Sequence, residues 1–159
     1  MSFRRAVAAA PAPVSAAFRL GKQALKGTHG AQVDCVDPRR FTGSIDLDAA
    51  LAGVVPGAPR WDYGIGYREG NGQESAIWIE VHPATTGEVS AVLQKHRWLC
   101  NWLRTEAHEL AAITKRQAGG KAFYWLATEA GVHIRQGSQQ AFRLQAAGFD
   151  LPRRRIDLS

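Results

Sequence analysis

The sequence predicts a single α/β domain, in which a helix, a β-hairpin, a long helix, a strand and a last helix surround a small mixed sheet. Three observations support this fold class. A chain of 159 residues with 45% apolar composition has the usual size of one domain and can fill one core. Two stretches of alternating apolar residues flank an Asn-Gly turn, and a long stretch with apolar residues at helical spacing follows them. The core is expected over residues 41–150.

The residues before this core are expected to form a basic, flexible arm over residues 1–40. The first 33 residues lack Asp and Glu but carry five basic side chains, at Arg4, Arg5, Arg19, Lys22 and Lys26. Such a composition is also typical of organelle transit peptides, which stays open as an alternative. A partial helical stripe of Val14, Phe18 and Leu25 lies within the arm.

The formal net charge of +6 favours a polyanionic partner such as nucleic acid, although a merely soluble basic protein has the same charge. The basic tail at residues 151–159 is expected to be solvated, with phosphate contact as the alternative. No run of eighteen apolar residues occurs, so we expect no membrane span and a cytoplasmic location.

The first element of the core is expected to be a short helix over residues 44–51. Ser44 can cap its start, Asp46 suits the positive end of the helix dipole, and Leu47 and Leu51 share one face. Gly53 and the glycines and prolines after it end the helix.

A β-hairpin is predicted from residues 61–67 and 75–82, joined by the turn Gly70-Asn71-Gly72. A three-residue loop centred on Asn71 creates three apolar pairs on one face: Trp61 with Val81, Tyr63 with Ile79, and Ile65 with Ile77. The same register sets Asp62 opposite Glu80 on the other face. A shift by one residue would scatter the apolar set over both faces, so the first register is expected.

A long helix over residues 87–113 should follow, with Thr85 and Glu88 forming a capping box. Its predicted core stripe consists of Val89, Val92, Leu93, His96, Leu99, Cys100, Leu103 and Leu110. Residues 122–128 are expected to form a buried strand and residues 132–135 a further short strand. Ser138 should cap a last helix that ends near Ala147.

The hairpin carries the residues with chemical potential. Two carboxylates opposite one another repel, and a divalent metal such as Mg²⁺ would compensate them. Gly64 and Gly66 would keep the neighbouring surface bare for a substrate. His82 lies on the face of Glu80 and can bind a metal-bound water, act as a general base or donate to a phosphate. Purely structural roles are the alternative, with Asp62 bonded to backbone groups and Glu80 paired with Arg60.

The order of elements and the Asp62…Glu80-Val81-His82 pattern resemble the PD-(D/E)xK nucleases, a superfamily with a restriction-endonuclease-like core. The resemblance covers residues 44–148 and implies that Asp62 and Glu80 hold Mg²⁺ or Mn²⁺. It also implies that a basic residue supports the attacking water, and that Asp46 or Asp48 can join the acids.

This chain departs from the family pattern at two positions. Trp61 stands where the family has proline, and His82 stands where the family has lysine. Lys95, on the following helix, can supply the missing charge, since the lysine migrates within this superfamily. The resemblance thus implies a metal-dependent endonuclease acting on DNA, with Asp62, Glu80, His82 and Lys95 in its active site. The alternative is a non-catalytic domain of the same fold that binds nucleic acid or another partner.

Other residues are weaker candidates for function. Trp98 and Trp102 lie one helical turn apart and can stack on bases, although packing against a neighbouring element is the favoured interpretation. His96 is expected to be a core histidine. Cys35 and Cys100 lack neighbours at the spacing of metal ligands, so a zinc site is not expected.

Overall fold

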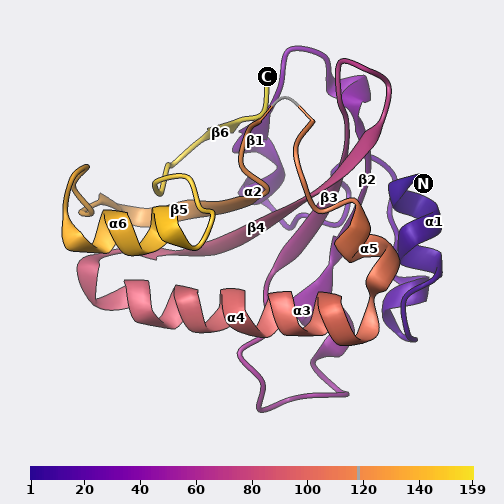
Figure 1. The fold of residues 1–159 in the computed structure, drawn as a ribbon, viewed down its shortest axis with the longest axis horizontal. Coiled ribbons are helices and arrows are strands. Elements are labelled where there is room, and N and C mark those ends of the chain that lie inside the picture. The colour runs from indigo at the N-terminus through magenta and orange to yellow at the C-terminus, as the bar shows by residue number, and fades with distance from the viewer. Residues whose placement is uncertain (118) are drawn as a thin grey trace.

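The computed structural model describes residues 1–117 and 119–159 and has a mixed α/β architecture (Figure 1). The strands are β1 (Val33–Asp34), β2 (Phe41–Asp46), β3 (Tyr63–Arg68), β4 (Glu74–Ala84), β5 (Phe123–Val132) and β6 (Ile156–Asp157). The α-helices are α1 (Phe3–Ala8), α2 (Thr28–Ala31), α3 (Leu47–Leu51), α4 (Val89–Glu106), α5 (His108–Ala112) and α6 (Gln139–Ala146). Three 3₁₀ turns, η1 (Val14–Ala16), η2 (Pro38–Arg40) and η3 (Thr86–Glu88), complete the set of helical segments.

The main sheet has four strands in the order β2-β3-β4-β5. The first three are antiparallel neighbours, whereas β5 pairs parallel to β4. A parallel neighbour requires a long crossover, which α4 and α5 supply. A separate parallel pair joins β1 to β6. The predicted fold class, α/β with a small mixed sheet, is therefore confirmed, and β2 is a strand that the sequence analysis missed.

Two apolar layers cover the faces of this sheet. One contains Trp61, Trp78 and Trp125 together with residues of α1 and α4, and α4 runs along that side of the sheet (Figure 1). The other contains Ile65 and Ile77 together with side chains from β1 and β6. Both faces of the sheet are thus buried.

The predicted hairpin register is confirmed, because Tyr63 pairs with Ile79 and Ile65 pairs with Ile77. The position of Trp61 was predicted wrongly. β3 begins only at Tyr63, so Trp61 does not follow the alternation of the strand, and it packs in the layer on the α4 side.

The N-terminal segment is packed into the core, so the expectation of a flexible arm outside it is wrong for these residues. Phe3, Ala6, Val7 and Ala10 are buried at the spacing of one helix face, while Arg4 and Arg5 are exposed. Val14 and Leu25 are also buried. Arg4 and Arg5 lie between buried residues of the same helix. The basic composition of the segment therefore predicted a solvated arm, although its apolar residues form one buried face.

The first predicted helix also needs correction. Residues up to Asp46 form β2, in which Ser44 is buried, and α3 begins only at Leu47. Asp46 takes the capping role assigned to Ser44, since its carboxylate accepts the Ala49 N–H at 2.9 Å.

The long helix is divided at Ala107, where the backbone leaves the helical region between α4 and α5. Most of the predicted stripe is buried, although Leu93 and Cys100 are partly exposed and Trp102 is buried in addition. The predicted capping box does not form, because Thr85 makes no side-chain capping bond.

The C-terminal elements differ from expectation in their extent. β5 continues to Val132, so the separate strand over residues 132–135 does not form. Ser138 caps α6 as predicted, accepting the Ala141 N–H at 3.2 Å. The tail is part of the fold and not a free solvated segment, because Ile156 and Leu158 are buried beside β1. Within the described residues, no helix has the length and apolar character needed to cross a membrane.

Candidate active site

Asp62 and Glu80 lie side by side at the end of the hairpin away from its turn. The Asp62 N–H donates to Glu80 Oε1 at 3.2 Å, and the Val81 N–H donates to Asp62 Oδ2 at 2.9 Å. Each carboxylate therefore has one oxygen bonded to the backbone of the opposite strand. The predicted juxtaposition of the two acids is present in the structure.

Lys95 joins the two acids from α4. Its Nζ donates to Glu80 Oε2 and lies 3.9 Å from Asp62 Oδ1. These are the two carboxylate oxygens that the backbone bonds leave free. Their negative charges thus converge on one cationic position, which Lys95 reaches because α4 packs across this side of the sheet.

His82 is held between two glutamates. Its Nε2 is 2.7 Å from Glu88 Oε2, and its Nδ1 is 3.6 Å from Glu80 Oε2. Its backbone carbonyl accepts the Trp125 Nε1–H at 2.9 Å. Glu80 and then Glu88 raise the pKa of His82, although burial opposes them. The ring is therefore protonated more readily than an ordinary histidine.

The site is closed at its base and open on one side. The Glu80 side chain is fully buried, whereas the side chains of Asp62, Lys95 and His82 retain 22%, 20% and 23% of their exposure. Burial, followed by the negative charge of Glu80, raises the pKa of Asp62 to about 7, against the lowering effect of Lys95. A cation or a small polar group can therefore approach from the side of Asp62 and Lys95.

The raised pKa of Asp62 makes stability depend on pH. In the unfolded chain Asp62 loses its proton near 3.8, whereas the folded protein keeps it until about 7. The folded state binds more protons within that window, so its stability falls as pH rises through it. We expect Asp62→Asn to leave the free energy of unfolding unchanged near pH 4 and to raise it by about 1–4 kcal/mol at pH 8.

Urea unfolding of both proteins at pH 4, 6 and 8 measures this difference. The contribution of His82 has the same sign but is present in both proteins, so it cancels from the comparison. A variant that is less stable than the wild type at pH 8 would show that the charged form of Asp62 stabilises the fold.

We expected Gly64 and Gly66 to leave a bare surface for substrate beside Asp62, and this expectation is wrong. Both glycines instead allow aromatic side chains to pack closely against the strand. A Cβ on Gly64 would lie 2.7 Å from the ring of Trp78. A Cβ on Gly66 would lie 2.5 Å from Phe3. Both glycines thus make room for aromatic side chains of the core.

The remaining candidate residues near the hairpin lie outside the cluster. Asp46 caps α3 and pairs with Lys26, and Asp48 pairs with Arg60 at 2.9 Å. Of the expected structural alternative, the pair between Arg60 and Glu80 is therefore not formed, whereas the bond between Asp62 and a backbone group is present. Glu88 belongs to the cluster but was assigned to a capping box by its spacing from Thr85.

Other sequence candidates are structural. His96 packs against the rings of Trp61, Phe123 and Phe149, and burial lowers its pKa to about 4, as expected of a core histidine. Cys35 and Cys100 are free thiols, and Cys35 donates to the Asp37 carbonyl.

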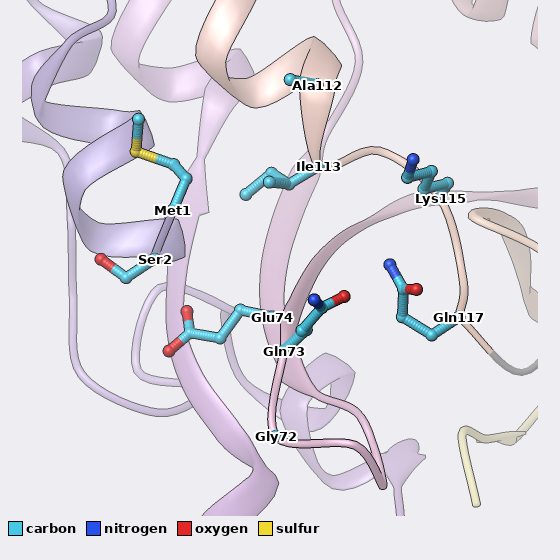
Figure 2. Close-up of a pocket in the computed structure, with 9 residues that line it drawn as sticks. All are labelled: Met1, Ser2, Gly72, Gln73, Glu74, Ala112, Ile113, Lys115 and Gln117. Atoms are coloured by element: carbon cyan, nitrogen blue, oxygen red, sulfur yellow. The ribbon is translucent and has the colours of Figure 1, made fainter.

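A polar pocket of about 540 Å³ lies at the opposite end of the hairpin, between α1, α5 and the β3–β4 turn (Figure 2). Glu74 lies on its wall, but this carboxylate already accepts the Phe3 N–H at 2.7 Å and the Thr42 hydroxyl at 3.1 Å. Ser2, Gln73, Lys115 and Gln117 are its other polar residues. Its acidic group is thus committed to anchoring α1, and the pocket does not adjoin the Asp62 cluster.

The metal that the resemblance implies would have Asp62 and Glu80 as its protein ligands. In the described part of the chain, no three His, Cys, Asp or Glu side chains form a metal-binding group. Mg²⁺, however, requires only one or two protein carboxylates and completes its shell with water and substrate oxygens. The two free oxygens of Asp62 and Glu80 are ligands of that type, and Mg²⁺ would have to take the position that the Lys95 amino group holds between them in this structure.

Comparison of this chain with known protein families, curated proteins and solved structures finds no match.

Proposed function

We propose that this protein is a metal-dependent endonuclease of the PD-(D/E)xK type, with DNA as its substrate and Asp62, Glu80 and Lys95 as its active site. The observation that carries the proposal is the position of Lys95, whose amino group contacts both acids of the hairpin. Lys95 on α4 would thus take the role of the family's lysine, whose position in the motif is occupied by His82 in this chain. Two acids and one lysine are the residue types on which the resemblance depends.

The fold supports the same proposal. The order α3, Asp62 and β3, turn, β4 with Glu80, α4, β5 and α6 is the order on which the resemblance to the restriction-endonuclease-like core rests, with β2 added before α3. Asp62 directly precedes β3, Glu80 lies on its antiparallel neighbour β4, and the lysine comes from the crossover helix that leads to the parallel strand β5. The net charge of +6 favours binding of a polyanion.

Each residue has a distinct role in the proposed reaction. Asp62 and Glu80 would hold Mg²⁺ or Mn²⁺, which when bound lowers the pKa of a water molecule and stabilises negative charge on the phosphate. Lys95 offsets the charge of the two acids and orients the attacking water. His82, whose ring nitrogens face Glu88 and Glu80 and whose pKa these glutamates raise, adds positive charge beside Glu80 instead of acting as a general base.

Cleavage of plasmid and oligonucleotide DNA tests the proposal. We expect cleavage to require Mg²⁺ or Mn²⁺ and to fall at least about 1000-fold in Asp62→Asn and in Glu80→Gln, because each change removes a metal-binding charge. The rate should rise with pH through about 7, since metal binding requires Asp62 without its proton. Glu109→Gln, an exposed acid on α5, is the matched control and should cleave normally.

Two measurements separate this function from a binding domain without activity. A protein that binds DNA but does not cut it with any divalent metal contradicts the nuclease proposal. If Mg²⁺ and Mn²⁺ also fail to raise its melting temperature, the acidic pair is structural, and a non-catalytic domain that binds nucleic acid or another partner is the correct interpretation.

A further inference from the structure

An apolar pocket of about 340 Å³ lies between α3 and α4. Its apolar lining comes from three segments: Pro11 and Ala12 after α1, Leu51, Val54 and Val55 at the end of α3 and after it, and Trp98 and Trp102 on α4. Val54 is 58% exposed, so part of this apolar surface is not covered by the rest of the chain. The volume is within the range of small-molecule sites and can accept one planar ring system.

The two tryptophans that line this pocket are stacked on one another. Their rings are stacked with an interplanar angle of 12° and a centroid separation of 6.3 Å. Trp102 is buried against the core, whereas Trp98 is only partly buried and lines the pocket. The packing expected from the sequence therefore accounts for Trp102 but leaves surface of Trp98 available to a ligand.

The rim of the pocket is polar, and the helix surface beside it is basic. Asn101, Thr105 and Glu106 place amide, hydroxyl and carboxylate groups around the opening. Arg97 and Arg104 are exposed on the same helix, and Arg104 donates to Asn101 Oδ1 at 2.8 Å. Donors and acceptors at a rim suit the edge of a nucleobase, and the arginines suit its phosphates.

Two elements, α3 and α4, connect this pocket to the Asp62 cluster. On α4, Trp98 follows Lys95 by three residues, which are neighbours on one helix surface. On α3, the Leu47 N–H donates to the Asp62 carbonyl at 2.8 Å, and Leu51 at the other end lines the pocket. Five helical residues span roughly 7 Å, so a base close to the reacting phosphate can reach the pocket.

From these contacts we infer that the pocket binds one unpaired nucleobase, stacked on Trp98, of a single-stranded DNA or of a locally unpaired region. This inference rests on the proposed nuclease function, because it places the base next to the phosphate at Asp62. A base inside a duplex is stacked on both sides and cannot enter without being extruded. The enzyme should therefore prefer single-stranded substrates.

The test measures DNA binding in EDTA, where cleavage does not occur. The probes are a labelled twelve-nucleotide single strand, its duplex, and a set of single strands that each carry one abasic nucleotide at a different position. We expect Trp98→Leu to weaken binding of the single strand by about tenfold to a hundredfold, the effect of one stacked base, and to leave duplex binding unchanged. Trp98→Phe keeps an aromatic face and should retain most of the affinity. Binding to the wild type should quench the fluorescence of Trp98. Trp61, Trp78 and Trp125 are buried away from solvent, so their fluorescence should not change.

Phe142→Leu is the matched control, because Phe142 is an exposed aromatic residue on α6 outside the pocket. An abasic nucleotide at one position of the strand should weaken binding to the wild type. The same abasic strand should bind to Trp98→Leu as strongly as the intact strand does. Equal single-strand affinities of the wild type and a folded Trp98→Leu variant would overturn the inference, as would equal affinities of the intact and all abasic strands. Single-strand binding through Trp98 without cleavage would instead retain the pocket and reject the nuclease.

Discussion

Replacing Lys95 with methionine should abolish cleavage and lower the free energy of unfolding by about 3 kcal/mol. Methionine keeps much of the length and apolar volume of the lysine chain but leaves the fully buried Glu80 carboxylate without its cationic partner. Removal of one member of a buried ion pair costs more than the pair itself contributes, because the remaining charge is desolvated and uncompensated. Cleavage assays and urea unfolding at pH 8 measure the two effects.

A second change separates the structural role of Lys95 from its catalytic role. Lys95→Met combined with Glu80→Gln removes both charges, so we expect most of the lost stability to return while cleavage remains absent. Lys95→Arg keeps the charge but replaces a compact ammonium with a larger planar group, and it should retain stability while losing most of the activity. Full activity of Lys95→Arg, or of Lys95→Met, would contradict the proposed role of the amino group. Arg97→Met, at an exposed neighbour on α4, serves as the control.

Phe3→Ala should lower the free energy of unfolding by about 3–5 kcal/mol, as large-to-small changes of buried phenylalanines do. Phe3 is fully buried on the sheet, against the backbone of Gly66, and its N–H donates to Glu74. Deletion of residues 1–10 should have a larger effect, because it exposes the whole surface that α1 covers. Chemical unfolding followed by tryptophan fluorescence measures both changes.

Arg5→Ala provides the matched control for α1. Arg5 is exposed on the opposite face of the helix, so its substitution should change stability by no more than about 0.5 kcal/mol. A deletion variant that remains folded and loses only its affinity for polyanions would contradict the structure and restore the interpretation of this segment as a free basic arm.

The hairpin could be predicted from sequence because its determinants are local. A turn at Asn71 and Gly72 and the alternation of residues 63–67 with 75–79 define one register, since a shift by one residue would break the apolar pairs and scatter their members over both faces. The adjacency of Asp62 and Glu80 follows from that register alone. The capping of α6 by Ser138 is local in the same sense, because it involves a backbone N–H three residues later.

Burial and long-range contacts were decided by the tertiary structure. Lys95 lies fifteen residues from Glu80, and its amino group meets the acids only because α4 packs across the sheet at one particular rotation. The family resemblance marked Lys95 as one candidate, but the rotation of α4 against the sheet could not be predicted from the sequence. Glu88 shows the reverse case, because its spacing fits a capping box while its carboxylate contacts His82 from another element.

By itself, the sequence determined the α/β class, the hairpin and the pairing of two acids, because these depend on periodicity and on turns within a few residues. It did not determine that residues 41–46 form a strand, that α1 completes the core, or that the glycines beside Asp62 accommodate aromatic rings. Those outcomes depend on which apolar surfaces remain uncovered once the other elements are assembled, and the hydrophobic effect acts on that total surface regardless of distance along the chain.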